Sequence, residues 1–377
     1  MTILIYLFKL HLKLIYFFLK FLKIDNSKIL LLSRQSNTKS IDFELIEADI
    51  KRRYPNKKVV ILTKTLLKHN FIIYYFHIFK QMYHLATAKV CLVDTYIIPV
   101  SILKHKEELV IIQLCHGLGN IKKFGRQTLK SESGKSEKLS NLMNMHGNYD
   151  YLISPSVETS KFYSKAFDMP IDKILPIGNP KIDYILDIYK NKEKILEQYP
   201  NLKEKPVILY VSTFRRYEDD YLQKFLEHVD FNKYNVVINI HPVAYKYHPD
   251  IEKNITDNRV YRCKEFTTQE LLSVADIAIT DYSSFVFESA ILEIPTYLFV
   301  PDYDKYVSKN GLNVDIFKEL PGYVYKEAEQ LFEKIGKNDY DTNIIKNFKD
   351  KYITNCNGNA TEILVDFIAK IWYNKGV

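Results

Sequence analysis

The 377-residue sequence contains little glycine, proline and cysteine, and each scarcity excludes a class of protein. Its 11 glycines and 13 prolines form no linker tract and no collagen-like repeat, so we expect short loops. The four cysteines include no C-x-x-C pair and have no histidine beside them at zinc-ligand spacing. We therefore expect reduced thiols in a cytoplasmic protein, with neither a disulfide framework nor a zinc site.

Concentrated positive charge is missing from most of the chain, although the net charge is +8. Residues 1–24 hold four of the 53 lysines and arginines and none of the 45 acidic residues, which leaves 49 basic against 45 acidic side chains elsewhere. This balance excludes a basic domain built to bind nucleic acid. The composition is 47% hydrophobic and 26% charged, as in globular proteins, and the length suits two domains.

The N-terminal segment, residues 1–24, lacks the roughly 20 consecutive apolar residues that a membrane-spanning helix needs. Its lysines are Lys9, Lys13, Lys20 and Lys23. Together with Tyr16 they are spaced alternately four and three residues apart, which places all five on one stripe of a helix. No small-residue cleavage site follows, which disfavours a signal peptide. The pattern predicts an amphipathic helix on an anionic membrane surface, at the cytoplasmic face of the cell membrane. A buried first helix, a signal sequence and a membrane span are the alternatives.

Short apolar runs alternate with longer helical patterns after residue 27, as in parallel sheets that are covered on both faces. The expected strands of a first domain are 28–33, 58–63, 90–94, 109–114, 151–154 and 174–177, and its helices are 42–53, 66–85 and 157–167. A charged helical stretch covers 184–199, and five strands follow at 206–213, 234–240, 258–263, 275–280 and 296–300. The sequence therefore predicts two α/β domains, residues 25–200 and 201–355, and a last helix within 356–377 that packs back on the first domain.

Ligands of open parallel sheets bind beyond the carboxyl ends of the strands, and a polar corner follows the strand 109–114. His116 lies there, and a histidine is the side chain best suited to take a proton from a hydroxyl near neutral pH. Gly117 and Gly119 allow a close approach of substrate. Lys122 and Lys123 add positive charge on the acceptor or phosphate side. The alternative is a histidine at a strand end before a solvated basic loop.

Two corners of the second domain follow its first two strands. Thr213 and Arg215 lie in the first corner, where a small hydroxyl and a guanidinium suit the oxygens of a phosphate. His241 ends the next strand, and Pro242 prevents the strand from continuing. A plain solvated loop is the alternative for the first of these corners.

Another corner of the second domain, after the strand 275–280, contains Asp281, Ser283 and Ser284 and precedes a helical run. Free N–H groups and the helix dipole attract an anion at such a position. Glu288 lies about one turn into the helix, where it would meet ribose hydroxyls. An ordinary serine helix cap is the alternative.

Common phosphate and metal motifs are missing. The SGKS at residues 133–136 lacks the glycine that a P-loop requires five positions before Gly134, and no G-x-G-x-x-G follows any expected strand. Asp302 and Asp304 form a D-x-D pair that is too short to identify a metal site, so a divalent ion there stays open.

As a set, these corners resemble the CDP-glycerol glycerophosphotransferase family, the teichoic acid and capsule polymerases and primases of bacteria. CHGLGNIKKFGRQTLKSESGKSEKLSNLMNMHGNYDYLIS at 115–154 is similar to the family pattern HxxGxxKKxGxQTLxxxSGxxEKLxxLMNMHxxYDY. GNPKID, TFRR, IHP and TDYSSFVFESA follow in the family's order. Lys181 stands in place of the usual arginine and Glu288 in place of the usual aspartate.

The resemblance implies a GT-B architecture of two Rossmann-like domains, with the donor bound mainly by the second. It implies transfer of a polyol phosphate from CDP-glycerol or CDP-ribitol to a hydroxyl of a lipid-linked acceptor, with release of CMP and no required cofactor or protein-bound metal. His116 would be the general base, and His241, Arg215, Ser283 and Ser284 would hold the diphosphate. The alternatives are a GT-B glycosyltransferase that uses a sugar nucleotide and a non-catalytic membrane-associated assembly protein.

Overall fold

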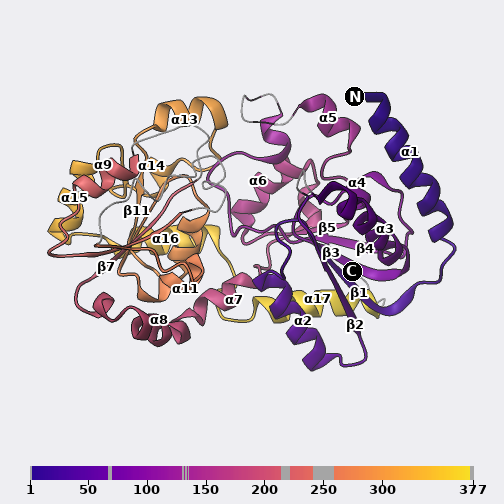
Figure 1. Ribbon diagram of the computed structural model, residues 1–377, viewed down its shortest axis with the longest axis horizontal. Coiled ribbons are helices and arrows are strands. Elements are labelled where there is room, and N and C mark those ends of the chain that lie inside the picture. The colour runs from indigo at the N-terminus through magenta and orange to yellow at the C-terminus, as the bar shows by residue number, and fades with distance from the viewer. Residues whose placement is uncertain are drawn as a thin grey trace. The chain divides into compact units, whose positions relative to one another are not determined.

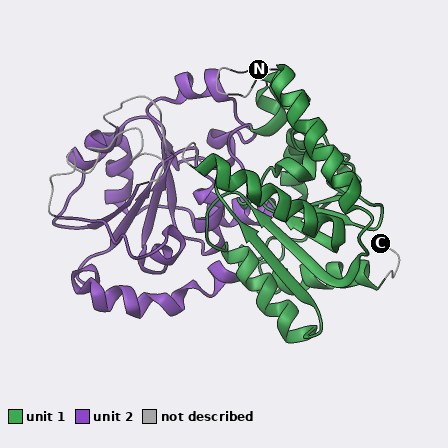
Figure 2. Ribbon diagram, turned by 45° about the vertical axis from the view of Figure 1, so that its right-hand side comes forward, with its two compact units in different colours: residues 1–118, 124–183, 354–377 green, residues 119–123, 184–353 purple. Residues whose placement is uncertain are grey.

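The computed structural model describes residues 2–66, 70–129, 131, 134, 136–213, 221–240 and 259–373. The chain forms two compact units (Figure 2): unit 1 comprises residues 1–118, 124–183 and 354–377, and unit 2 comprises residues 119–123 and 184–353. Residues 119–123 and 184–200, which we expected in the first domain, thus belong to unit 2.

The sheet of unit 1 has six parallel strands in the order β2-β1-β3-β4-β5-β6 (Figure 1). They are β1 (Asp25–Ser33), β2 (Lys58–Thr63), β3 (Ala88–Val93), β4 (Val110–Gln113), β5 (Tyr151–Ile153) and β6 (Ile174–Leu175). All six overlap predicted strands, because strands covered on both faces form continuous apolar runs.

Helices cover both faces of this sheet. The helices and 3₁₀ turns of unit 1 are α1 (Thr2–Leu19), α2 (Ile41–Arg53), α3 (Phe71–Thr87), α4 (Ile98–Ile102), η2 (Gly125–Thr128), α5 (Glu137–Leu142), α6 (Val157–Phe167), η3 (Ile171–Lys173) and α17 (Ala360–Trp372). Leu30 and Leu32 of β1 share one core cluster with α1, α3 and α4, whereas Ile29 and Leu31 share another with α2 and α17. The alternation of side chains along a strand produces these two layers.

The sheet of unit 2 also has six parallel strands, in the order β12-β11-β10-β7-β8-β9. They are β7 (Val207–Val211), β8 (Asn235–Asn239), β9 (Val260–Tyr261), β10 (Ile277–Thr280), β11 (Thr296–Phe299) and β12 (Val324–Tyr325). Five of them match predicted strands. The sequence analysis missed β12, because a two-residue edge strand has no detectable period.

The helices around this second sheet are short. After α7 (Lys181–Leu186), which leads from unit 1 into unit 2, they and the 3₁₀ turns are η4 (Ile188–Asn191), α8 (Lys192–Gln198), η5 (Pro200–Lys203), α9 (Tyr221–Glu227), α11 (Thr268–Leu271), η6 (Leu272–Val274), α12 (Phe285–Ile291), α13 (Tyr303–Asn310), α14 (Ile316–Glu319), α15 (Ala328–Lys337) and α16 (Thr342–Tyr352). The single helical stretch expected over 184–199 is thus divided into α7, η4 and α8.

The chain leaves unit 1 after residue 183 and returns to it at residue 354, and hydrogen bonds within unit 1 hold both points. The carboxylate of Asp183 accepts hydrogen bonds from the backbone N–H groups of Ala360 (3.0 Å) and Thr361 (2.7 Å) at the start of α17. Thr354 donates its backbone N–H to Pro155 O at 2.6 Å. The departing chain at residue 183 and the returning chain at residue 354 are therefore anchored to the same edge of unit 1.

Candidate active site

The loop after β4 presents the predicted base. Cys115 has a φ of 56°, in the left-handed region that few residues other than glycine adopt, and its N–H donates to Gln113 Oε1 at 3.1 Å. Cys115 and Leu118 are buried, whereas His116 between them is exposed. The turn thus directs His116 outward at the carboxyl edge of the sheet, where the sequence placed it.

Residues of the GNPKID segment, 178–183, hydrogen-bond to this loop. Asn179 Nδ2 donates to Leu114 O at 2.6 Å, and Lys181 Nζ donates to His116 O at 2.7 Å. The backbone N–H of Lys181 donates to Asp42 Oδ1 at 2.9 Å, which fixes the segment to α2. The sequence analysis noted Lys181 only as a departure from the family pattern; the structure shows that it contacts the loop of His116.

A buried carboxyl group lies at the neighbouring strand end. Asp94, which follows β3, is 3% exposed and accepts a hydrogen bond from Thr95 Oγ1 at 3.1 Å. The pKa of Asp94 is raised to about 6: burial is the largest cause and the negative charge of Asp42 adds to it, while hydrogen bonds from Ser33 and Thr95 oppose the rise. We did not predict Asp94 as a site residue. Its position at the end of an expected strand was the sequence signal that could have identified it.

Two predicted donor-side residues of unit 2 bind one another. Thr213, after β7, donates its backbone N–H to Asp281 Oδ1 and Oδ2 (both 2.9 Å) and its hydroxyl to Asp281 Oδ1 (2.7 Å). Asp281 follows β10 and is buried. The pair joins the ends of two adjacent strands and thereby fixes the corner from which α12 starts.

The two serines before α12 have different environments. Ser283 Oγ accepts the backbone N–H of Phe285 at 3.2 Å. Ser284 occupies the N-cap position, but its side chain makes no capping hydrogen bond. The ordinary cap alternative therefore fails for Ser284. Glu288, one turn into α12, is buried and accepts a hydrogen bond from Gln269 Nε2 at 2.7 Å.

The remaining predicted site residues are placed as follows. Gly117 O accepts the hydroxyl of Tyr163 at 3.2 Å in unit 1, whereas Lys122 and Lys123 lie in unit 2, where Lys122 forms an isolated β-bridge with Leu312. Arg215 and His241 lie outside the described residues. Their roles stay predictions.

The D-x-D pair has two separate environments. Asp302 is buried and accepts the hydroxyl of Tyr282 at 3.1 Å, whereas Asp304 is exposed and pairs with Lys326 Nζ at 2.8 Å. In the part of the chain that the structure describes, no three His, Cys, Asp or Glu side chains are grouped to hold a metal.

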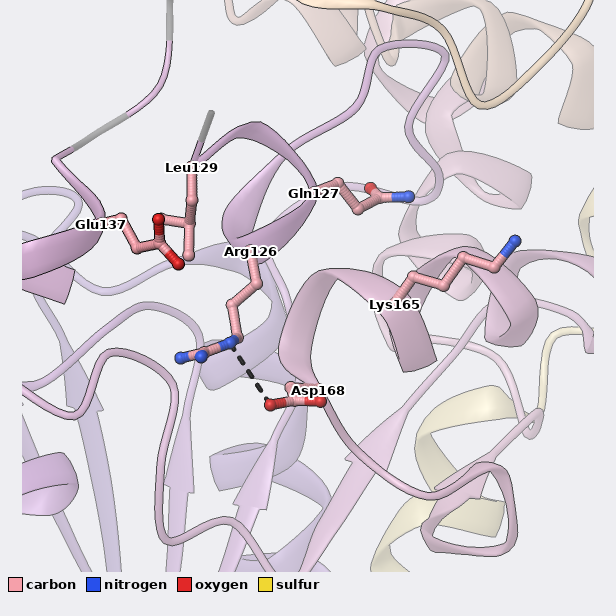
Figure 3. A pocket seen from close by; sticks show the side chains of 6 residues that line it. All are labelled: Arg126, Gln127, Leu129, Glu137, Lys165 and Asp168. Carbon is pink, nitrogen blue, oxygen red and sulfur yellow. Dashed lines mark ion pairs between the residues drawn. The ribbon is translucent and has the colours of Figure 1, made fainter. Parts of the chain in front are cut away.

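A surface pocket of about 270 Å³ lies in unit 1, beside η2 and α6 (Figure 3). Figure 3 shows Arg126 reaching toward Asp168, with 3.4 Å between Arg126 Nε and Asp168 Oδ2. None of the residues that line it belongs to the predicted catalytic or donor-binding set.

The N-terminal helix differs in part from its expected orientation. Lys9 Nζ donates to Leu142 O, and Tyr16 is buried with its hydroxyl 2.8 Å from His105 Nδ1, so part of the predicted lysine stripe faces the protein. Apolar side chains that are more than half exposed include Ile3, Leu4, Leu7, Leu10, Leu14, Phe17, Phe18 and Phe21 at the N-terminus and Phe71, Ile72, Ile73 and Phe76 on α3. Residues Thr2–Leu19 are also long and apolar enough to cross a membrane, a test that core helices and signal sequences pass too.

A family model described as CDP-Glycerol:Poly(glycerophosphate) glycerophosphotransferase matches residues 14–370. The chain belongs to this family. The resemblance seen in the sequence motifs is thereby confirmed, and with it the predicted class of enzyme, a transferase. Polyol-phosphate transfer in teichoic acid synthesis is confirmed as its function at the level of the family.

Individual relatives agree with this assignment. The chain is 30% identical over 373 residues to a teichoic acid ribitol-phosphate primase of Bacillus spizizenii, with 92% of each chain covered. It is 27% identical to a teichoic acid glycerol-phosphate primase of Bacillus subtilis, with 94% of each covered. The solved wall teichoic acid polymerase TagF is 22% identical with a TM-score of 0.73, covering 93% of this chain and 90% of that one. This likeness confirms the predicted two-sheet α/β fold.

Proposed function

We propose that this glycerophosphotransferase family member transfers glycerol phosphate or ribitol phosphate from a CDP-polyol to a hydroxyl of a lipid-linked acceptor and releases CMP. The observation that carries the proposal is the turn at Cys115, which presents an exposed His116 at the carboxyl edge of the sheet in unit 1. The sequence motifs that resemble this family include this histidine.

The proposed chemistry is an in-line displacement. The acceptor oxygen forms a bond to the phosphorus that bears the polyol, and the bond from that phosphorus to the oxygen of CMP breaks, so that CMP leaves with the electron pair. The imidazole of His116 accepts the proton of the attacking hydroxyl. Lys181 holds the backbone carbonyl of His116 and so restricts where the imidazole can lie.

On the donor side, the proposed diphosphate contacts are Ser283 and Ser284. The hydroxyl of Ser284 makes no capping bond with α12, which leaves it suited to a phosphate oxygen. Thr213 and Asp281, whose hydrogen bonds fix this corner, are proposed as further donor-side residues. Glu288 is proposed to contact the ribose, and no cofactor or metal is required.

The experiment supplies CDP-glycerol and CDP-ribitol separately, each with a lipid-linked acceptor, and measures CMP release and product mass. The donor that gives product identifies the polyol. His116→Ala is expected to abolish turnover and to leave CDP-polyol binding intact, while His228→Ala, which replaces an exposed histidine of unit 2, is the matched control. Transfer from a sugar nucleotide with release of UDP or GDP would instead support the glycosyltransferase alternative, and residual transfer by His116→Ala with weak donor binding would refute the base assignment.

We also propose that the apolar surface of α1 and α3 binds the cytoplasmic face of the cell membrane peripherally. Ile3, Phe18 and Ile72 are 76%, 63% and 72% exposed, and an apolar surface made of many such side chains marks a site of interaction with a membrane or a protein. Two helices that pack on one another share this surface, since Tyr74 and Ile78 of α3 lie in one core cluster with Leu12 and Tyr16 of α1. Exposed Lys13 and Lys23 suit anionic headgroups.

Vesicle flotation tests this proposal with the full chain. Phe17→Ser with Phe18→Ser on α1, and Ile72→Ser with Phe76→Ser on α3, are each expected to weaken binding to phosphatidylglycerol vesicles. Tyr189→Ser, an exposed aromatic side chain of unit 2, is the control. Undiminished binding by both double variants would refute the surface, and resistance of the membrane-bound protein to alkaline carbonate would indicate a spanning helix.

A further inference from the structure

Residues 119–123 form a short strap that belongs to unit 2, although the chain on both sides of it belongs to unit 1. Ile121 is fully buried, and its carbonyl accepts the N–H of Asn313 at 2.7 Å. Lys123 donates its N–H to Gly311 O at 3.1 Å, and Lys122 forms an isolated antiparallel bridge with Leu312. The strap is therefore held in place by backbone hydrogen bonds to residues 311–313.

At the first residue of the strap, the backbone touches an aromatic ring. A Cβ atom added to Gly119 would lie 2.8 Å from three ring atoms of Phe287. The ring cannot easily give way, because Phe287 is 1% exposed and its centroid lies 5.2 Å from that of Phe348 and 5.7 Å from that of Tyr352. Gly119 does not adopt a positive φ, so its backbone conformation does not require a glycine. The close approach of the Phe287 ring does.

These contacts connect two parts of the proposed reaction site through the chain. Phe287 lies on α12, between Ser284 at its start and Glu288. Gly119 is three residues from His116, so their Cα atoms can be no more than about 11 Å apart in any arrangement of the two units. Lys181 Nζ donates a hydrogen bond to the backbone carbonyl of His116 itself.

We propose that the seating of Gly119 on Phe287 positions His116 for catalysis, so that the location of the base depends on the helix that follows the donor corner. This inference rests on the proposed function, in which His116 is the base. Gly119 and Phe287 are positioning residues: neither contacts the reacting atoms, and both act through the loop that carries His116. A methyl group at residue 119 would displace the strap and, through three peptide units, the imidazole.

The test is a double-mutant cycle in the full-length protein with the CDP-polyol that the wild type uses. Gly119→Ala is expected to lower kcat by about 10- to 100-fold, as for a catalytic group displaced by up to an ångström, and to change donor KM little. Phe287→Leu removes the ring edge, so the double variant is expected to regain much of the kcat lost by Gly119→Ala. Phe287→Met is a second relief variant, because its flexible side chain refills the site if leucine destabilises it.

Gly336→Ala is the matched control, since a Cβ atom there, on α15, meets nothing within 4 Å. Melting temperatures of all variants separate positioning from loss of fold. The inference is overturned if Gly119→Ala has the kcat of Gly336→Ala, or if the two substitutions of the cycle act independently. A wild type that transfers no polyol phosphate would refute the proposed function instead, so the two failures are distinguishable.

Discussion

Replacement of the buried carboxyl group Asp94 by an amide is predicted to stabilise unit 1 at neutral and alkaline pH. Burial of Asp94 raises its pKa from 3.8 to about 6, a shift of about two units or roughly 3 kcal/mol. Because the folded-state pKa is the higher one, the stabilisation that the protonated carboxyl provides is complete below about pH 4 and is lost as the pH rises through about 6. The wild type above that pH therefore contains a buried carboxylate at the end of β3.

Asp94→Asn keeps the shape of the protonated acid and cannot ionise. The gain in the free energy of unfolding is expected to be small near pH 4 and to approach an upper limit of roughly 3 kcal/mol near pH 8. Hydrogen bonds from Ser33 and Thr95 favour the carboxylate, so the amide loses part of their contribution and the measured gain falls below that limit.

Denaturant unfolding followed by tryptophan fluorescence measures this change. The single tryptophan, Trp372, is buried on α17 in the core of unit 1, so its emission reports on the unit that contains Asp94. Asp172→Asn, which replaces an exposed carboxyl group of unit 1, is the control. A gain that is the same at both pH values, or a loss near pH 8, would refute the assignment of a raised pKa to Asp94.

Three further predictions concern single contacts. Lys181→Met, which removes the hydrogen bond to His116 O, is expected to lower kcat about 10-fold with an unchanged melting temperature. Lys181→Arg keeps a donor and is expected to retain most of the wild-type kcat. Equal kcat in both variants would contradict this role. Asp183→Ala removes both acceptors at the start of α17 and is expected to lower the free energy of unfolding by roughly 2–4 kcal/mol, measured by Trp372 fluorescence; a loss within error would show the cap to be unimportant. Ser284→Ala removes no capping bond, so the melting temperature is expected to stay constant while donor KM rises; an unchanged KM would argue against a donor contact.

Most of the fold could be predicted because its signals are local. Strands such as β2 and the helix α6 have the predicted residues as their bounds, since an apolar run between polar segments, or a serine cap before an amphipathic stretch, defines each one. The same holds for His116, which follows an evident strand. The division of 184–199 and the edge strand β12 could not be predicted, because neither carries a period long enough to detect.

The environments of the site residues were not predictable in the same way. Lys9 was expected on a cationic surface stripe, but it donates to a carbonyl at the end of α5. Thr213 and Asp281 were expected on the donor side, and the structure adds that they hydrogen-bond to one another. Each outcome depends on a partner distant in the sequence, and no pattern of neighbouring residues encodes it.

The sequence by itself determined the two parallel sheets, the strand ends that carry polar side chains and the family to which the chain belongs, because these follow from periodicity and short motifs. Only the tertiary structure decided that Asp94 is buried enough to shift its pKa, that Lys181 holds the loop of His116, and that Gly119 must be a glycine. Burial and close approach depend on which surfaces meet after folding. Phe287, far along the chain, therefore determines what residue 119 can be.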